Sequence, residues 1–249
     1  MLSVLITGAG RGLGLEYVRQ LLASSKPPQH LFACCRSPES AEVLQNIARS
    51  NPAVKILKLD VTDQATLAEA VRNVDGIVGE KGLNLLINNA GIMARQNSET
   101  ATAEEMERLH RVNVIGPLQV TQTFLPVLKR AATFTSSNDA TMSIHTAAIV
   151  NVTSIMGCIS HNTSGVCVSY KTSKVAVNML TNCMAHDFGP YGILAVAMHP
   201  GWVQTDMGSK RAPVTPEESI SGVLATLHKL QGREASGKVY QWTGEILTW

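Results

Sequence analysis

Residues 2–14 read LSVLITGAGRGLG. The first part, LSVLIT (2–7), is a mostly apolar run that predicts a buried strand, and a helical spacing of apolar residues begins near Gly12. TGAGRGLG (7–14) joins the two with no spacer. A strand, a glycine-rich turn and a helix in this order form the start of a βαβ unit. The stretch therefore predicts an α/β fold with a ligand-binding loop.

The same alternation of strand and helix continues along all 249 residues. Further strands are predicted at 31–35, 54–60, 83–89, 147–154, 193–199 and 237–242. Helices are predicted at 12–25, 41–50, 65–74, 103–132 (two helices, broken near Gly116 and Pro117), 168–188 and 216–230. Continuously apolar strands are typical of a parallel sheet that helices cover. We therefore predict a single-domain Rossmann fold over residues 1–249, a doubly wound parallel sheet of about seven strands with helices on both faces.

Three segments are predicted to be loops rather than linkers between domains. Substrate loops are expected near 155–168 and 203–215. TFTSSNDATMS (133–143) is polar and is predicted to be a flexible surface insertion before the fifth strand.

Composition excludes several classes of protein. Hydrophobic residues make up 45% of the chain and the net charge is only +2, which argues against nucleic-acid binding through phosphate neutralisation. The five cysteines are odd in number and show no C-x-x-C spacing, so we expect reduced thiols in a cytoplasmic protein and no metal. We find no signal peptide and no apolar run long enough to span a membrane.

The glycines of the first loop fit a phosphate-binding turn. Gly8, Gly12 and Gly14 follow the pattern T-G-x-x-x-G-x-G. Glycine permits positive φ and lets the backbone approach a ligand closely. The helix that begins here offers unpaired N–H groups and a positive dipole end to a pyrophosphate. The loop therefore predicts a dinucleotide cofactor.

The residues after the next three strands indicate which cofactor binds. The second strand ends in ACCR (33–36), with no acid to bind the ribose 2′-hydroxyl of NAD. Arg36 and Arg11 suit a 2′-phosphate instead, which favours NADP(H). Asp60 is interpreted either as an acceptor for an adenine amino group or as a cap of the following helix. NNAG (88–91) leaves room for a flat ring and a ribose, while its asparagine amides are suited to locking neighbouring strands.

VSYKTSK (168–174) places Tyr170 and Lys174 four residues apart, on one face of the predicted helix. A carbonyl oxygen that is being reduced must receive a proton, and a tyrosine can donate it. A nearby ammonium favours the phenolate, so we expect Lys174 to lower the pKa of Tyr170. The lysine also suits the ribose hydroxyls of the cofactor.

Two more polar residues are candidates for the same site. Ser154 closes the fifth predicted strand, and its hydroxyl is suited to binding the substrate oxygen. Thr153 is the rival hydroxyl, but side chains alternate along a strand, so only one of the two faces the ligand. Asn113 lies among apolar helical residues. It is interpreted either as an amide that bonds backbone at a helix kink or as the holder of a water beside Lys174.

Taken together, the motifs resemble those of the short-chain dehydrogenase/reductase family. The resemblance is carried by T-G-x-x-x-G-x-G, N-N-A-G, the strand-end serine and Y-x-x-x-K, and it spans essentially the whole chain. HPGWVQTDM (199–207) is similar to the family's Pro-Gly segment, which contacts nicotinamide. More narrowly, GAGRGLGLEYV (8–18), PPQHLFACCR (27–36) and the closing tryptophan resemble the sniffer-type carbonyl reductases and the related C-factor proteins.

The resemblance implies NADPH-dependent carbonyl reduction, with Ser154, Tyr170 and Lys174 catalytic and Asn113 completing a tetrad. With the loop glycines and NNAG it gives the expected cofactor contacts: Gly8, Arg11, Gly12, Leu13, Gly14, Arg36, Asp60, Val61, Asn89, Ala90, Gly91, Tyr170, Lys174, Pro200, Val203 and Thr205. Ser154 and Tyr170 are 16 residues apart, somewhat more than is usual in the family. We expect the longer loop to reshape the substrate mouth and leave the catalytic residues in place.

The substrate is expected to be a small lipophilic carbonyl compound, namely a ketone, quinone or aldehyde. Residues expected to line the crevice are mostly apolar: Ile92, Met93, Ile155, Met156, Trp202 and Met207. Two other functions remain open, a low-turnover NADP(H)-binding sensor or scaffold and an NAD-linked alcohol or steroid dehydrogenase. The apolar helices at 103–132 and 168–188 leave both a homo-oligomer and a monomer open.

Overall fold

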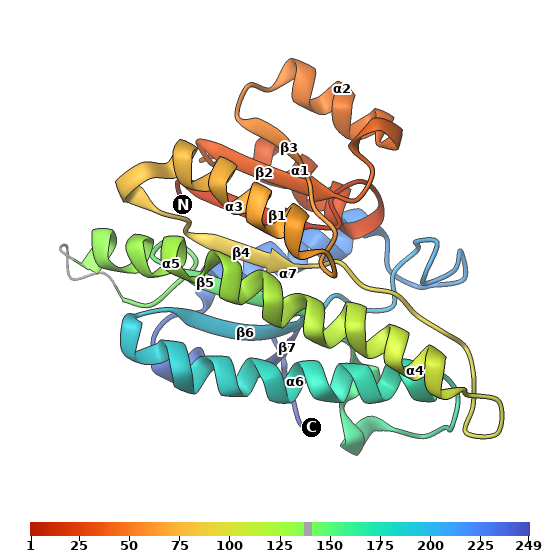
Figure 1. Ribbon diagram of the computed structural model, residues 1–249. Helices are drawn as coiled ribbons and strands as arrows, with labels where there is room; N and C mark the ends of the chain where they lie inside the picture. Colours follow the sequence, from red (N-terminus) through yellow and green to blue (C-terminus); the bar gives the residue numbers. More distant parts are fainter. Residues whose placement is uncertain (137–140) are drawn as a thin grey trace.

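The structure is a computed structural model that describes residues 1–136 and 141–249. One sheet of eight strands runs through the molecule in the order β3-β2-β1-β4-β5-β6-β7-β8 (Figure 1). The strands are β1 Ser3–Thr7, β2 His30–Cys35, β3 Val54–Lys58, β4 Leu85–Asn88, β5 Ala148–Val152, β6 Leu194–His199, β7 Val239–Gln241 and β8 Ile246–Leu247. All neighbouring pairs are parallel except β7 and β8. The predicted doubly wound α/β fold is therefore confirmed.

The helices lie on both faces of the sheet, and their apolar sides form two cores. They are α1 Gly12–Ala23, α2 Glu42–Ser50, α3 Gln64–Val78, α4 Ala103–His110, α5 Gly116–Ser136, α6 Val168–Phe188 and α7 Pro216–Lys229. Alternate residues of β1 face the two sides of the sheet. Val4 and Ile6 pack with α1, α2 and α7. Leu5 packs with α3, α5 and α6. Burial of strands on both faces is the reason their sequences are continuously apolar.

Three details of the elements differ from the sequence-based expectations. The break near Gly116 and Pro117 is instead a π-helical segment, η3 (Arg111–Ile115), which joins α4 to α5 without a loop. Residues 133–136, expected in a surface loop, continue α5, and residues 137–140 of that expected loop lie outside the described residues. The sheet also contains an antiparallel strand that was not predicted, β8, because two residues are too few to show an alternating pattern.

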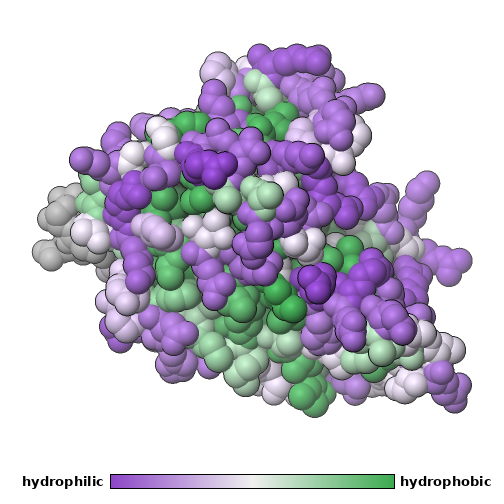
Figure 2. Space-filling model, in the orientation of Figure 1, coloured by the Kyte–Doolittle hydropathy of each residue, from purple (hydrophilic) through white to green (hydrophobic). Residues whose placement is uncertain are grey.

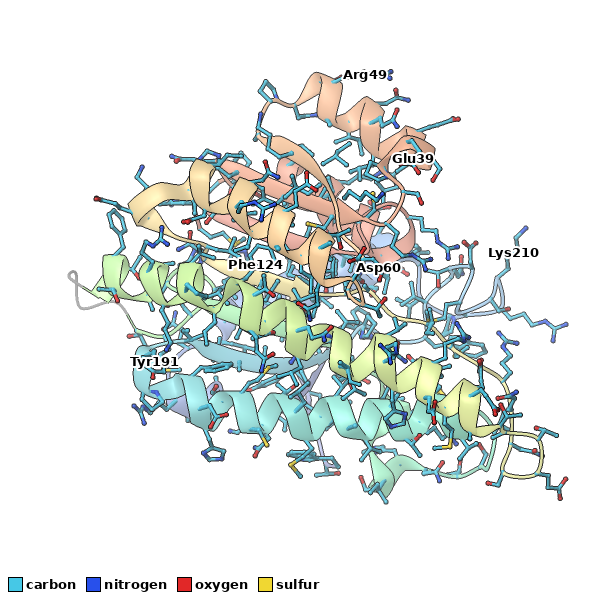
Figure 3. The ribbon with its side chains drawn as sticks, in the orientation of Figure 1. Glu39, Arg49, Asp60, Phe124, Tyr191 and Lys210 are labelled. Carbon is cyan, nitrogen blue, oxygen red and sulfur yellow. The ribbon has the colours of Figure 1, made fainter. Side chains whose placement is uncertain are left out.

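The carboxyl ends of the parallel strands bring the predicted site residues together. Chain order reverses between β1 and β4, and ligands of open α/β sheets bind beyond the strand ends at such a point. Figure 3 shows Asp60 at this edge of the sheet, Lys210 on a loop beyond it, and Tyr191 at the opposite end. The glycine loop after β1, NNAG at the end of β4 and Ser154 after β5 therefore meet at one edge.

One face of the molecule carries apolar side chains over α5 and α6 (Figure 2). Met179 of α6 is among the exposed large apolar residues, and so is Ile115, the last residue before α5. The expected homo-oligomer stays a prediction. Within residues 1–136 and 141–249, no helix combines the length and the apolar character that crossing a membrane requires.

Candidate active site

The glycine loop has the shape of a cradle that side chains would fill. Gly8 and Gly12 have φ of +69° and +54°, in the region that favours glycine. A Cβ on Gly8 would lie 3.0 Å from Ala90 Cα, and one on Gly14 would lie 2.1 Å from the carbonyl oxygen of Gly8. Gly14 therefore lets α1 approach the end of β1, and the first N–H groups of α1 face the space beyond the strand. The loop fits the diphosphate of a dinucleotide.

The asparagines of NNAG lock the neighbouring strands, which is one of the two roles predicted for this segment. Asn89 Nδ2 donates to the carbonyl oxygen of Thr7 at 2.9 Å, and the Thr7 hydroxyl accepts from the N–H groups of Asn89 and Ala90 at 3.0 Å each. In β4, Asn88 Nδ2 donates to Asn151 Oδ1 of β5 at 2.8 Å. These bonds fix the segment after β4 beside the glycine loop.

Charged residues surround the outer part of the cradle. Arg11 Nη1 lies 2.5 Å from Asp206 Oδ2, and both side chains are largely in solvent. Arg36 is exposed at the end of β2. Asp60 Oδ1 accepts from the N–H and the hydroxyl of Thr62. The N-cap of α3 is Asp63, so the interpretation of Asp60 as that helix cap is wrong.

The other expected cofactor contacts lie around the same edge. Leu13, in the first turn of α1, packs against the core. Val61 is buried and lies close to Gly116, where an added Cβ would come within 2.7 Å of its side chain. The carbonyl oxygen of Pro200 accepts from Ser219 Oγ at 2.6 Å. The predicted contacts of these three residues with a cofactor stay predictions.

The loop after β6 approaches the glycine loop. Val203 is buried and forms a parallel bridge with Val214. The methyl group of Thr205 lies 3.8 Å from where a Cβ on Gly12 would be. With the ion pair between Arg11 and Asp206, this contact brings the predicted 203–215 loop over the start of α1.

Ser154 and Tyr170 meet at the end of β5. Ser154 is the N-cap of a short 3₁₀ turn, η4 (Ile155–Gly157), and its Oγ accepts from the N–H of Met156 at 3.2 Å. Tyr170 lies in the first turn of α6 and is hydrogen-bonded to Ser154. Both side chains are only 8% exposed. The predicted pair is therefore assembled in a site largely shielded from water.

The pKa of Tyr170 moves in the direction opposite to the expectation. Burial raises it from its ordinary value of 10.0 to about 12, the hydrogen bond from Ser154 opposes the rise, and Cys167 adds to it. The Lys174 ammonium lies 5.6 Å from the centroid of the Tyr170 ring. The predicted lowering of this pKa by Lys174 is wrong for this structure, because loss of solvation is the main cause of the shift and Lys174 is not among its causes.

Lys174 is itself buried and held in place. Its Nζ donates to the carbonyl oxygen of Val152, the last residue of β5, at 2.8 Å. Burial lowers the pKa of Lys174 from its ordinary value of 10.5 to about 8. A Cβ on Gly91 would lie 3.8 Å from Nζ, so the lysine side chain reaches the segment NNAG. The predicted common face of Tyr170 and Lys174 is present on α6.

The choice between the two adjacent hydroxyls is decided by packing. Thr153 is 2% exposed, and its Oγ1 donates to Asn178 Oδ1 of α6 at 2.6 Å. The Thr153 hydroxyl is therefore already hydrogen-bonded inside the protein. Ser154 lies beside Tyr170, and the predicted binding of a substrate oxygen by its hydroxyl stays a prediction.

Asn113 is buried in the π-helical segment η3. Its amide makes two bonds of 2.9 Å with the backbone of Ile92 and donates to Ser173 Oγ at 3.0 Å. Ser173 Oγ in turn donates to the carbonyl oxygen of Tyr170. The amide does bond backbone, but that of the segment after β4 rather than its own helix. A water held beside Lys174 stays a prediction.

Apolar side chains pack beside Tyr170. Ile92, Met93 and Met156, all predicted crevice residues, join its cluster. Ile155 packs elsewhere, against Ala197 and its neighbours. Three residues of the cluster were not predicted from the sequence, Ala94, Leu109 and Cys167. The backbone of Cys167 has a φ of +62°, which no sequence pattern around it indicated.

Trp202 and Met207, the remaining two crevice candidates, are exposed. They lie with the loop after β6 rather than in the cluster around Tyr170. In the described part of the chain, no group of three or more His, Cys, Asp or Glu side chains is arranged to hold a metal ion.

Residues 3–215 match the family model described as short chain dehydrogenase. The chain belongs to the short-chain dehydrogenase family. Among curated proteins it is similar to C-signal of Myxococcus xanthus, with 34% identity over 67% of this chain and 93% of that protein. The family membership implied by the sequence motifs is therefore confirmed.

Two solved structures of the family are similar over their full length. An NADPH-bound carbonyl reductase from chicken fatty liver is 41% identical, with a TM-score of 0.94 over 99% of this chain and 98% of that chain. The carbonyl reductase Sniffer of D. melanogaster is 37% identical, with a TM-score of 0.97 over 100% of both chains. The chain is thus an oxidoreductase of this family whose structural neighbours are carbonyl reductases.

Proposed function

We propose that the protein reduces lipophilic ketones, quinones or aldehydes to alcohols with NADPH. The observation that carries this proposal is the meeting of Ser154, Tyr170 and Lys174 beside Gly91, at the strand edge that also carries the glycine loop. A protein that only bound a dinucleotide would have no need of a buried hydroxyl pair next to the cofactor site. The carbonyl reductases similar to this chain support the same reaction.

NADP(H) is the cofactor that the charges favour. The exposed Arg11 and Arg36 are suited to a 2′-phosphate, and guanidinium groups bind phosphate in bidentate pairs. Gly8, Gly12 and Gly14 leave the space that a diphosphate needs. The similar chicken protein was solved with NADPH bound.

Tyr170 is the proton donor in this proposal. When bound, NADPH supplies the hydride to the carbonyl carbon and is oxidised to NADP⁺. Because the pKa of Tyr170 is raised to about 12, its hydroxyl remains protonated at neutral pH. It donates this proton to the substrate oxygen, which completes the alcohol. The Ser154 hydroxyl donates a hydrogen bond to the same oxygen and steadies the charge that develops there.

Lys174 and Asn113 support the donor from behind. The Lys174 ammonium keeps its bond to Val152 and offers its other protons to the ribose hydroxyls of the cofactor. Asn113 fixes the backbone of Ile92 and, through Ser173, the first turn of α6. Both residues thereby hold Tyr170 and the segment after β4 at a constant separation.

Lipophilic substrates follow from the lining beside Tyr170. Ile92, Met93, Met156 and Leu109 supply apolar surface, and binding of an apolar ligand there releases water. The five free cysteines support a reducing compartment, so we place the reaction in the cytoplasm.

The test is NADPH oxidation by the purified protein with a panel of phenanthrenequinone, isatin and unsaturated aldehydes. Turnover of at least one carbonyl compound, faster with NADPH than with NADH, is expected. Binding of NADPH without turnover of any substrate would instead favour the sensor or scaffold. Tighter binding of NADH than of NADPH would favour the NAD-linked alcohol or steroid dehydrogenase.

A further inference from the structure

Ser154 lies in a short turn that is attached to α6 on both sides. The turn leaves β5 at Val152 and continues through η4. The backbone of the turn is held to β6 and to itself, since the N–H of Thr153 donates to the carbonyl oxygen of Met198 at 2.9 Å and the N–H of Gly157 donates to that of Ser154 at 2.8 Å. Neither bond reaches α6, so other contacts must set the distance between Ser154 and Tyr170.

Asn178 makes both attachments with one amide. Its Oδ1 accepts from the hydroxyl of Thr153 at 2.6 Å, immediately before Ser154. Its Nδ2 donates to the carbonyl oxygen of Gly157, which ends η4, at 2.9 Å. Asn178 is 1% exposed, so both bonds are made away from water. Each would leave a buried polar group unpaired if it were lost.

The packing of Gly157 makes the attachment close. A Cβ on this glycine would lie 2.7 Å from the carbonyl carbon and 2.9 Å from the Cβ of Lys174. The end of η4 therefore touches the helix itself, and only glycine fits there. Its carbonyl oxygen has no freedom to move away from Asn178 without moving the whole turn.

Asn178 also shares a helix face with the two residues that act in the proposed reaction. Tyr170, Lys174 and Asn178 are spaced four residues apart, so they lie in one row along α6. Lys174 adds a third attachment to the same turn through Val152. One rigid helix thus carries the proton donor and, one and two turns further along, the groups that hold the Ser154 turn.

We propose that Asn178 is a positioning residue that sets the place of the Ser154 hydroxyl relative to Tyr170 by holding Thr153 and Gly157. The assignment rests on the proposed reductase function. Asn178 does not touch the substrate in this proposal. Its effect on rate arises because a displacement of about 1 Å at a reacting group costs up to about 10²-fold in rate.

The chain offers a matched control for this proposal. Thr153 and Thr181 are both buried, and each is hydrogen-bonded to an asparagine across the contact between β5 and α6. Thr181 Oγ1 accepts from Asn151 at 2.9 Å, farther along the helix from Ser154. Replacing either threonine with valine nearly keeps its volume. Thr153→Val removes one buried bond, and Thr181→Val removes two, because Thr181 Oγ1 also donates to the carbonyl oxygen of Val177. Only Thr153→Val loosens the Ser154 turn.

The experiment compares Thr153→Val, Asn178→Ala and Thr181→Val by thermal unfolding, NADPH affinity and steady-state kinetics. We expect Thr181→Val to lose at least as much stability as Thr153→Val, and all three variants to retain NADPH affinity. Thr153→Val and Asn178→Ala should lose about tenfold to hundredfold in kcat, with Thr181→Val near wild type. If Asn178→Ala does not fold, Thr153→Val carries the comparison.

Rescue by a conservative variant separates positioning from general loosening of the fold. Thr153→Ser keeps the hydroxyl that donates to Asn178 and loses a buried methyl group, so it should be less stable than the wild type and keep nearly the wild-type kcat. If general loosening set the rate, kcat would instead follow stability across Thr153→Ser, Thr153→Val and Thr181→Val. Equal kcat in Thr153→Val and Thr181→Val, or a kcat that follows stability alone, would overturn the proposal.

Failure of this inference and failure of the proposed function give different results. If Ser154→Ala and Tyr170→Phe keep full reductase activity, the function is wrong. If those two variants are inactive while Thr153→Val behaves as Thr181→Val does, the function stands and only the role of Asn178 is wrong.

Discussion

The two halves of the site are built in opposite ways. Around Ser154, Tyr170 and Lys174 the side chains are at most 8% exposed, and their backbones are fixed by buried hydrogen bonds. Around the glycine loop, the side chains of Arg11 and Asp206 are 78% and 81% exposed. Burial therefore controls proton affinities in the first half, whereas in the second half water and salt screen the charges.

The difference follows from what each half has to do. A proton donor needs a constant position and a site with little water, which buried bonds supply. A phosphate group arrives from solvent with its charge, and exposed guanidinium groups attract it without first losing their own hydration. An exposed ion pair such as Arg11 with Asp206 is worth little on its own, so a phosphate can displace the aspartate.

The largest expected effect is a loss of reaction rate on substitution in the buried half of the site. Tyr170→Phe keeps the ring beside Leu109 and Cys167 and removes only the hydroxyl. We expect kcat for carbonyl reduction to fall about 10²- to 10⁴-fold, the usual contribution of a general acid, with NADPH affinity unchanged. Steady-state kinetics and fluorescence titration measure the two quantities. Tyr191→Phe, at the far end of the sheet in Figure 3, is the control and should stay active, whereas turnover retained in Tyr170→Phe would refute the assignment.

A second effect of burial is a dependence of stability on pH. The pKa of Lys174 is about 8 in the folded protein and 10.5 in the unfolded chain, so between these values the unfolded chain binds a proton that the native lysine does not. This group therefore adds about 2 kcal/mol to the free energy of unfolding of the cofactor-free protein from pH 8 to pH 10. Burial also raises the pKa of the thiols of Cys34, Cys35 and Cys158, and these groups lower stability over the same range.

Urea unfolding of the wild type and of Lys174→Met at a series of pH values isolates the contribution of Lys174. We expect the stability of the wild type relative to Lys174→Met to rise by about 2 kcal/mol from pH 8 to pH 10, because the two proteins share the same thiols and tyrosines. Lys171→Met, which replaces a less buried lysine of the same helix, should show no such pH-dependent difference from the wild type. A difference between the wild type and Lys174→Met that does not change with pH would mean that Lys174 is well solvated.

The smallest expected effect belongs to the exposed half and depends on salt. Arg36→Ala and Arg11→Ala should each raise the Kd for NADPH about tenfold and leave the Kd for NADH unchanged, because only NADPH carries the 2′-phosphate. Isothermal titration at low and high ionic strength should show the loss shrinking as salt rises. Arg49→Ala, on α2 in Figure 3, is the matched control. Equal losses for the two cofactors would place the arginines away from the 2′-phosphate.

The sequence predicted the fold well where its signal was long. Continuous apolar strands separated by helical periods specify a covered parallel sheet, and the glycine loop marks where it binds its ligand. Short or context-dependent elements were missed. The two residues of β8 carry no period, and a π-helical segment leaves Gly116 and Pro117 inside continuous helical structure.

The sequence predicted which residues form the site, but it did not predict the pKa of Tyr170 or the hydrogen bonds of Asn178. Tyr170 and Lys174 share a helix face because i and i+4 always do. Whether burial or the ammonium decides the pKa of the phenol depends on how much chain surrounds it, and here burial prevails. Asn178 has no motif of its own, since its partners Thr153 and Gly157 come from a distant part of the chain.

By itself, then, the sequence determined the parallel sheet, the glycine loop and the polar residues at the strand ends, because periodicity and glycine conformation are local properties. Only the tertiary structure decided that Ser154 rather than Thr153 faces the tyrosine, that the pKa of Tyr170 rises, and that α6 holds the serine turn. Desolvation and hydrogen bonding across the fold depend on segments far apart in the chain, and no local pattern encodes their distances.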